Sequence, residues 1–477
     1  MLFNSLKFLL LFPLIFGFYW AIPAKFSNWR KWFLILVSYL LYMNWKPAYA
    51  LVLLGVTLVT YWGGQILQLR GDSEEIKVDE KDRRKRLVWL FAILGLLPLL
   101  IFKYYNFLNN SISDGLTAIG LQFSLPGLNW AVPVGISFFS FQAIGYMLDV
   151  YHGRIKEEKN LTDYVLFVSF FPQVASGPIS KADELLPQVK IAKFFNYDQA
   201  VSGLKYLLWG MFLKVVLADR AGIYVDTVFE SYDKFSGVGC ALASVLYSIQ
   251  IYADFAGYSL MAVGLAKTLG FDLINNFKRP YFAKSVSEFW KRWHISLTRW
   301  LTQQVYIPLG GSRCSKIRNY WNILVTFLVS GIWHGANWTF IAWGMIHGLF
   351  QIIEKALGWN KRDSKGIVKV LRIIFTFAIV TVAWVIFRSP SILDAFGIIG
   401  RYASADGKFI ADIQTLFYIV IAITPLLLLE VGQEFFPKFY GKVRSSRIAR
   451  WAVYLAVFAM IVLIGVHDGS SFIYVSF

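Results

Sequence analysis

The sequence lacks most of the residues and motifs on which soluble enzymes rely for chemistry. Its 477 residues include only 2 cysteines and 5 histidines. Cys240 and Cys314 are too few for a disulfide framework or a cysteine metal site, and we expect no bound metal. The sequence also has no P-loop, no His-Glu-x-x-His and no Gly-x-Ser-x-Gly motif. These absences exclude the usual ATPases, zinc proteases and α/β-hydrolases.

Charge is also scarce, since charged residues make up 16% of the chain, whereas 57% of the residues are hydrophobic and the mean hydropathy is +0.53. This balance is typical of a membrane protein. Because a helix needs roughly 20 apolar residues to cross a bilayer, the apolar runs predict about ten to twelve membrane-spanning helices. We therefore expect an all-α polytopic membrane protein with a single domain over residues 1–477. The runs lie at about residues 5–23, 32–45, 48–69, 87–107, 161–177, 204–220, 238–265, 322–350, 370–388, 413–430 and 449–466.

The net charge of +18 does not indicate nucleic-acid binding, because the basic residues collect in loops between apolar runs. The positive-inside rule and contact with anionic membrane lipid explain such a distribution. The segment 70–86, with seven Lys or Arg, is expected on the cytoplasmic side.

Two segments, 109–140 and 272–318, contain Gly, Pro and aromatic residues but no clean apolar span. Backbone of this kind at membrane depth must be buried in protein or line a watery cavity. The sequence therefore predicts that a functional site lies in these segments.

Two histidines are the main candidates for chemistry, because an imidazole in an apolar setting is costly unless it has a partner or a task. His294 lies in the run FWKRWHIS and His334 in SGIWHGANW. If residues 285–301 form one helix, Trp290 and His294 share a face and Lys291 lies three residues before the histidine.

The surrounding stretch, residues 278–318, holds nine Lys or Arg and the single acid Glu288, with tryptophans interleaved. This pattern predicts an interfacial amphipathic helix. Its cations have two interpretations, which stay open: anchoring to lipid headgroups, or binding of an anionic, nucleotide-bearing donor such as coenzyme A. The candidate donor-binding residues are Lys291, Arg292 and Arg299.

His334 has a better-defined setting. Gly331 and Gly335 form a small-xxx-small pattern that lets another backbone approach closely. Asn337, three residues on, is expected on the same side of the helix as His334, with Trp333 as a further supporting residue. The alternative is a core histidine bonded to a neighbouring carbonyl. His347 would lie about 20 Å further along a continuous helix and on the opposite face, so it is excluded.

Asp254 is the only acid between Asp233 and Asp272. A lone carboxylate in an apolar segment needs an Arg, Lys or His partner, because unpaired burial costs several kcal/mol. Two roles stay open for it: orienting a catalytic imidazole, or holding two helices together.

Several of these runs occur together in one known family. The chain resembles the membrane-bound O-acyltransferase family, and within it the bacterial alginate O-acetylation branch, most clearly over about residues 130–350. The resemblance rests on PVGISF (133–138), FFPQ (170–173), SGPI (176–179), YADFAGY (252–258), NFKRPY (276–281), EFWKRWHISL (288–297), VYIPLGG (305–311), SGIWHGANW (330–338) and FIY (472–474).

The resemblance implies a helical bundle with re-entrant and interfacial helices around a central funnel or tunnel. It further implies transfer of an acyl group, expected to be acetyl, from a cytoplasmic thioester such as acetyl-CoA to hydroxyls of an extracytoplasmic polysaccharide. Alginate-like exopolysaccharide and peptidoglycan are the expected acceptors, reached directly or through a periplasmic or secreted partner, in a bacterial inner membrane. The family's catalytic histidine falls on His334 and its second functional histidine on His294. Burial and nearby cations would keep such an imidazole neutral, as a general base requires.

Two alternatives to this function remain. D-Alanyl transfer to teichoic acid would use the same chemistry with a carrier protein as donor. A transporter or non-catalytic membrane protein could also hold a polar histidine site, although a carrier should show paired half-repeats with broken helices, and the sequence shows none.

Overall fold

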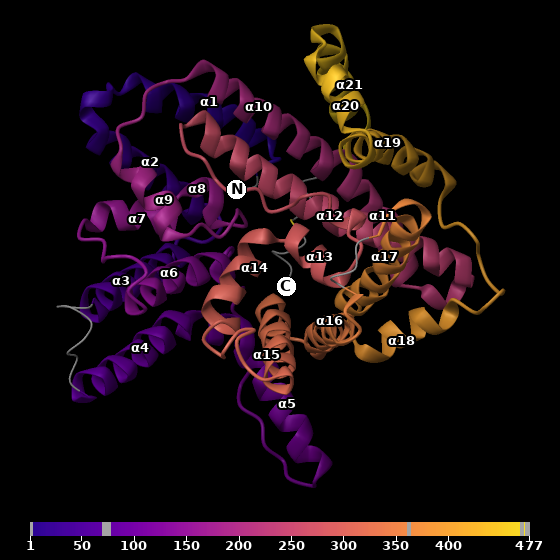
Figure 1. Ribbon diagram of the computed structural model, residues 1–477, viewed down its shortest axis with the longest axis horizontal. Coiled ribbons are helices and arrows are strands. Elements are labelled where there is room, and N and C mark those ends of the chain that lie inside the picture. Colours follow the sequence, from indigo (N-terminus) through magenta and orange to yellow (C-terminus); the bar gives the residue numbers. More distant parts are fainter. Residues whose placement is uncertain (1–2, 69–77, 360–363, 468–471, 473–477) are drawn as a thin grey trace. The chain divides into compact units, whose positions relative to one another are not determined.

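The computed structural model describes residues 3–68, 78–359, 364–467 and 472 of the chain. Within these ranges the protein is helical and has no extended strand beyond one isolated bridge between Phe235 and Lys408. The contacts group the chain into two compact units. Figure 1 shows the helices of both units as a ribbon coloured along the sequence. Unit 1 comprises Phe3–Leu204 and Ala262–Ile274, and unit 2 comprises Lys205–Met261 and Asn275–Phe477. The expected single domain stays a prediction.

Unit 1 contains nine complete helices, counted over the described residues. α3 packs against α4 and α6 through small residues: a Cβ atom at Gly63 or Gly64 would lie within 3 Å of Met147 or Tyr146 of α6. Tyr164 of α7 donates a hydrogen bond to Thr60 of α3 at 2.8 Å. The helices are α1 (Leu6–Ala21), α2 (Ser27–Met43), α3 (Tyr49–Leu67), α4 (Val78–Leu99), α5 (Tyr105–Ala118), α6 (Ile136–Tyr151), α7 (Leu161–Ser169), α8 (Phe171–Val174) and α9 (Ala182–Lys190).

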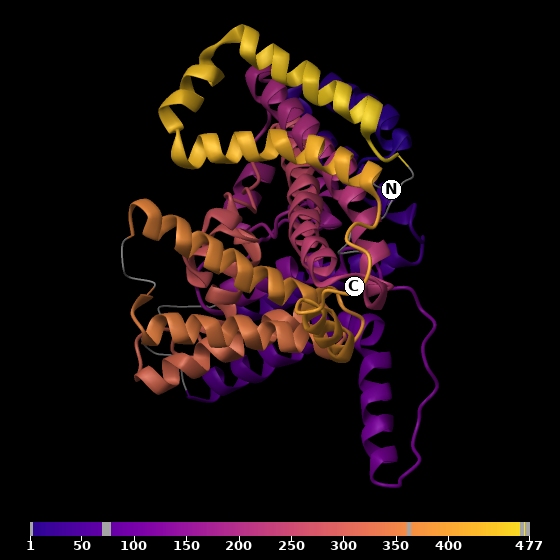
Figure 2. The same ribbon diagram turned by 90° about the vertical axis from the view of Figure 1, so that its right-hand side faces the viewer.

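Two further helices, α10 (Tyr197–Met211) and α12 (Gly237–Thr268), begin in one unit and end in the other. α10 continues through a π-helical turn, Phe212–Ala218, into α11. In unit 2, α15, α16 and α17 lie side by side, as their orange ribbons show in Figure 2. The helices of unit 2 are α11 (Asp219–Phe229), α13 (Val286–Arg292), α14 (Ile295–Leu301), α15 (Lys316–His334), α16 (Trp338–Ala356), α17 (Gly366–Arg388), α18 (Ile392–Arg401), α19 (Ile413–Phe435), α20 (Pro437–Ser445) and α21 (Arg447–Ile464).

The polytopic all-α fold class is confirmed. Among the described residues, seven helices are long and apolar enough to cross a membrane, or eight if the bent pair Leu6–Ala21 and Ala24–Met43 is one span. This is fewer than the expected ten to twelve. The seven are Tyr49–Leu67, Glu80–Ala118, Tyr197–Phe229, Gly237–Thr268, Gly366–Arg388, Ile413–Phe435 and Arg447–Ile464.

The difference comes from apolar runs that the chain breaks. The run at 161–177 divides into α7, with nine residues, and the short α8. The run at 322–350 divides at Gly335 into α15 and α16, and α15 carries buried Asn319 and Asn322 on its face. Hydropathy alone does not register these breaks.

The two segments without a clean span behave differently from one another. Residues 275–318 lie in unit 2, and several residues between 287 and 306 line a cavity described below, as expected. Residues 119–132 are mainly exposed, with Ile119 at 71% and Trp130 at 53%, so the expectation of burial is wrong there. Part of the basic segment 70–86, residues 70–77, lies outside the described residues.

Candidate active site

Three histidines of unit 2 lie in one buried row of aromatic rings. The ring of Trp333 contacts both His294, with centroids 5.7 Å apart, and His334, with centroids 4.9 Å apart. Trp343 contacts His334 at 4.9 Å and His347 at 4.9 Å. Trp290 contacts His347 at 5.2 Å and completes the row. We call these six residues the histidine row, in which the three imidazoles are at most 3% exposed.

His294 lies at a sharp break between two short helices. α13 ends at Arg292 and α14 begins at Ile295, so the single helix expected over 285–301 is wrong. His294 has φ 43° and ψ 53°, which is the left-handed region that non-glycine residues rarely adopt. Trp290 and His294 therefore do not share a face of one helix, and Lys291 does not lie one helical turn before the histidine.

A neighbouring segment holds this left-handed turn in place. The backbone carbonyl of Asn276 accepts a hydrogen bond from Ile295 N at 3.0 Å, and its side-chain Oδ1 accepts one from Ser296 N at 3.1 Å. Lys278 N donates to Arg292 O at 2.9 Å. The two residues after His294 and one before it are thus fixed, as a backbone in a costly conformation requires.

His334 is the last residue of α15, and the chain turns directly afterwards into α16. The close approach expected from the glycines is confirmed: a Cβ at Gly331 would lie 2.3 Å from the carbonyl oxygen of Phe340 on α16. A Cβ at Gly335 would lie 2.0 Å from the Phe340 ring. The ring of His334 is enclosed by Trp333, Trp343 and Phe387.

Asn337 does not face the His334 imidazole from the same helix, because the helix ends at His334. Asn337 instead caps α16: its Oδ1 accepts from Thr339 N at 3.0 Å. Its Nδ2 donates to the carbonyl of Pro390 at 2.9 Å. The expected pairing of imidazole and amide on one helical face is therefore wrong. An asparagine directly before an apolar run is a common first residue of a helix, so the sequence contained a signal for this helix start.

His347 was excluded on the assumption of a continuous helix, and that assumption is also wrong. The turn after His334 brings α16 back against α15, and His347 lies four residues after Trp343, on the same face of α16. Its Nδ1 accepts a hydrogen bond from the indole N–H of Trp290 at 3.3 Å. His347 therefore belongs to the same row as His334 and His294.

Asp254 has the basic partner that its burial predicted, and the partner is Lys214. Lys214 Nζ lies 2.7 Å from Asp254 Oδ1 and 2.7 Å from Asp219 Oδ1. Lys214 belongs to the π-helical turn Phe212–Ala218, whose i to i+5 geometry places Asp219 on the same side. Of the two roles left open, this contact favours joining helices, here α12 with the α10–α11 segment.

The three expected donor-binding cations have different surroundings. Arg292 is held in ion pairs with Glu288 at 2.6 Å and with Glu434 of α19 at 3.2 Å. Lys291 is exposed, and Arg299 is half-buried. The ion pairs of Arg292 indicate that it fixes α13 to α19.

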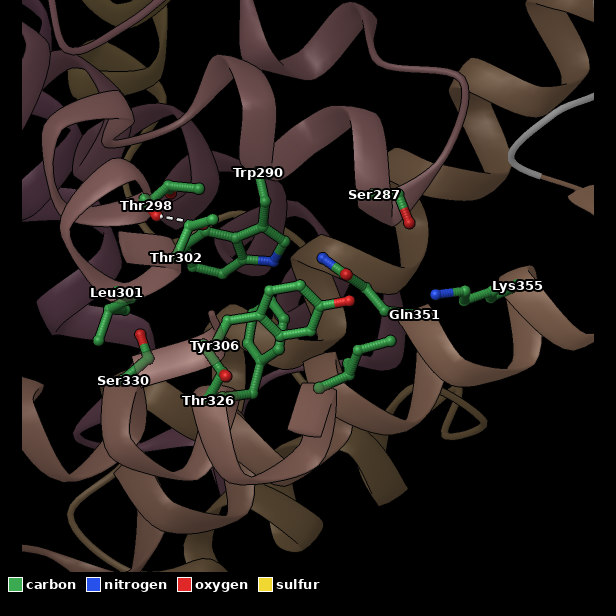
Figure 3. Close-up of a pocket in the computed structure, with 12 residues that line it drawn as sticks. Ser287, Trp290, Thr298, Leu301, Thr302, Tyr306, Thr326, Ser330, Gln351 and Lys355 are labelled. Atoms are coloured by element: carbon green, nitrogen blue, oxygen red, sulfur yellow. Dashed lines mark hydrogen bonds between the residues drawn. The ribbon is translucent and has the colours of Figure 1, made fainter. Parts of the chain in front are cut away.

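A cavity of about 260 Å³ lies between α13, α14, α15 and α16 (Figure 3). Figure 3 shows Ser287, Gln351 and Lys355 towards one end, and Leu301 and Ser330 towards the other. Trp290 is the one member of the histidine row that lines it. Other lining residues are Thr298, Thr302, Tyr306, Ile323, Thr326 and Phe327.

The electrostatics favour a neutral imidazole. Burial lowers the pKa of His294 from its usual value to about 3, so this ring carries no charge near pH 7. Of the two causes expected from the sequence, burial and nearby cations, burial accounts for the lowered pKa. Within the part of the chain that the structure describes, no cluster of three His, Cys, Asp or Glu is arranged to hold a metal ion.

Comparison with known proteins gives matches over most of the chain. Residues 154–388 match the model of MBOAT, the membrane-bound O-acyltransferase family. A probable alginate O-acetylase of Pseudomonas syringae pv. tomato is 37% identical over 82% of this chain and 73% of that protein. The peptidoglycan O-acetyltransferase of Helicobacter pylori is 32% identical over 85% of this chain and 80% of that protein. A teichoic acid D-alanyltransferase of Bacillus subtilis is 27% identical over 62% of this chain and 76% of that protein.

Proposed function

Because the chain belongs to the membrane-bound O-acyltransferase family, and is a multi-pass membrane O-acyltransferase, we propose that it transfers acetyl from acetyl-CoA to hydroxyls of an extracytoplasmic polysaccharide. The names of its relatives support this choice: two of them are an alginate O-acetylase and a peptidoglycan O-acetyltransferase. We propose a bacterial inner membrane as its location. A periplasmic or secreted acetyltransferase partner would complete delivery to the polymer.

The observation that carries the proposal is the buried histidine row, one member of which, Trp290, lines a cavity of about 260 Å³. His334 is enclosed by the rings of Trp333, Trp343 and Phe387, and it is 3% exposed. As the acceptor oxygen attacks the thioester carbonyl, His334 takes the hydroxyl proton. The carbon–sulfur bond then breaks, the ester forms, and the proton passes from the imidazolium to the leaving thiolate.

The cavity supports a different set of donor contacts from the one that the sequence suggested. Lys355 lies at the end opposite Ser330, and its Nζ hydrogen-bonds to Asn319 Oδ1. Asn319 Nδ2 in turn donates to Tyr306 Oη at 2.7 Å. Lys355 is thus a fixed cation suited to a phosphate of coenzyme A, whereas Arg292 is already engaged with two carboxylates.

The test uses the purified full chain in lipid vesicles with labelled acetyl-CoA inside and an acceptor polysaccharide outside. Transfer of label to the polymer by the wild type, and its loss in His334→Ala, is expected. A parallel arm offers a D-alanyl carrier protein, since D-alanyltransferases are also relatives. Transfer of D-alanine with no use of acetyl-CoA would overturn the acetyl proposal.

A further inference from the structure

The cavity stops one helical turn short of His334. Its lining follows one stripe of α15, through Ile323, Thr326, Phe327 and Ser330. The next residue on that stripe is His334, four positions after Ser330 and about 6 Å further along the helix. His334 does not line the cavity.

Trp290 is the member of the histidine row that lies between the cavity and the histidines. The indole is 4% exposed, and its ring contacts Phe327 at 5.3 Å and Trp343 at 5.5 Å. Trp343 in turn contacts His334 at 4.9 Å. A smaller side chain at position 290 would therefore extend the cavity into apolar space bounded by Phe327 and Trp343.

α16 holds Trp290 in two ways. His347 Nδ1 accepts the indole N–H at 3.3 Å and so fixes the ring plane. Two turns further along α16, the carboxylate of Glu354 accepts hydrogen bonds from Val286 N at 2.6 Å and Ser287 N at 3.0 Å. These bonds fix the first turn of α13, and Trp290 belongs to the same helix.

We propose that Trp290 limits the length of the acyl group that the enzyme accepts, and that His347 is the positioning residue that holds Trp290 in place. The inference rests on the proposed function, in that the acyl end of the donor enters this cavity. An acetyl group ends at the indole, whereas a longer chain meets the ring. Because the ring is fixed by both a hydrogen bond and packing, it cannot swing aside without losing His347.

The experiment measures kcat/KM for acetyl-CoA and butyryl-CoA in the vesicle assay. Burying one methylene corresponds to about a fourfold gain, so Trp290→Ala should raise the butyryl-to-acetyl ratio on the order of tenfold. Trp290→Phe should give a smaller rise and serves as the second variant if the alanine variant does not fold. Trp321→Ala, an exposed tryptophan of α15 outside the cavity, is the matched control and should leave the ratio unchanged.

His347 is tested by a conservative pair. His347→Gln keeps an acceptor for the indole N–H and should keep the wild-type ratio, whereas His347→Leu removes the acceptor and should raise it. Folded Trp290 variants that use acetyl-CoA with an unchanged ratio would overturn the length limit. Equal ratios in the two His347 variants would overturn its positioning role. If the wild type uses neither thioester, the proposed function fails instead, so the two failures are distinguishable.

Discussion

Two groups of buried polar side chains lie within unit 2, and they are built in opposite ways. In the ion cluster of Lys214, Asp219 and Asp254, each charge lies 2.7 Å from an opposite charge. In the histidine row, the imidazoles are surrounded by indole and phenyl rings. Lys214 and Asp254 are 1% exposed and His294 is fully buried, so burial alone does not distinguish the groups.

The difference follows from what each group does when water is removed. A buried ammonium or carboxylate needs a partner, since isolated burial costs several kcal/mol. An imidazole can lose its charge instead, at a pH close to neutrality. The ion cluster is therefore suited to joining helices, and the histidine row is suited to accepting a proton from a substrate.

The largest expected effect tests the histidine row. His334→Ala should lower the rate of acyl transfer by roughly 10²–10⁴-fold, the usual contribution of a general base. The thermal stability should change little by comparison, and both quantities are measured on protein purified in detergent. His467→Ala, which changes an exposed histidine, is the control and should keep its activity. Normal acetylation by the His334 variant would show that the histidine row, like the ion cluster, has no catalytic role.

The ion cluster should respond in the opposite sense. Lys214→Met leaves two buried carboxylates without their shared cation, so we expect a loss of about 3–5 kcal/mol in the free energy of unfolding. Thermal unfolding and membrane level report this loss. Lys205→Met, on the same helix but exposed, is the matched control. If the Lys214 variant has normal stability but no activity, the ion cluster takes part in catalysis and does not only join helices.

A smaller effect is expected where the histidine row depends on the backbone. Asn276→Ala removes the side-chain acceptor of Ser296 N and so loosens the left-handed turn at His294. A lost hydrogen bond of this kind is worth about 1–3 kcal/mol, and we expect a fall in kcat with little change in the donor KM. Asn276→Asp would keep an acceptor oxygen but would bury a carboxylate at a position that is 1% exposed, so it should lower the stability as well as the rate. If His294→Ala and Asn276→Ala both leave kcat unchanged, His294 has a packing role.

The sequence was sufficient for the family, the helical class and the two motif histidines, because these depend on composition and local runs. It was not sufficient to predict which side of a helix each candidate residue occupies. Asn337 and His347 were placed on a helix continuing from His334, but the backbone turns at Gly335, and both positions changed. Likewise Lys214 is 40 residues from Asp254, and no local periodicity relates a π-helical turn to a distant carboxylate. Contacts between segments decide such positions.

The smallest expected effect concerns Cys314, which belongs to neither group. A thiol can carry an acyl group as a thioester and so divide the transfer into two steps. Cys314, however, is exposed and lies before the first residue of α15, whereas His334 is the last residue of that helix. The 18 residue steps from Lys316 to His334 correspond to about 27 Å. An acyl group on Cys314 would thus be far from the imidazole that activates the acceptor.

We expect Cys314→Ser to keep activity within about twofold, as a change at an exposed position away from the site should. Labelled acetyl-CoA followed by hydroxylamine treatment checks for a thioester on the wild type. A trapped thioester at Cys314, with activity lost in the serine variant at a normal protein level, would show that the histidine row does not complete the transfer alone.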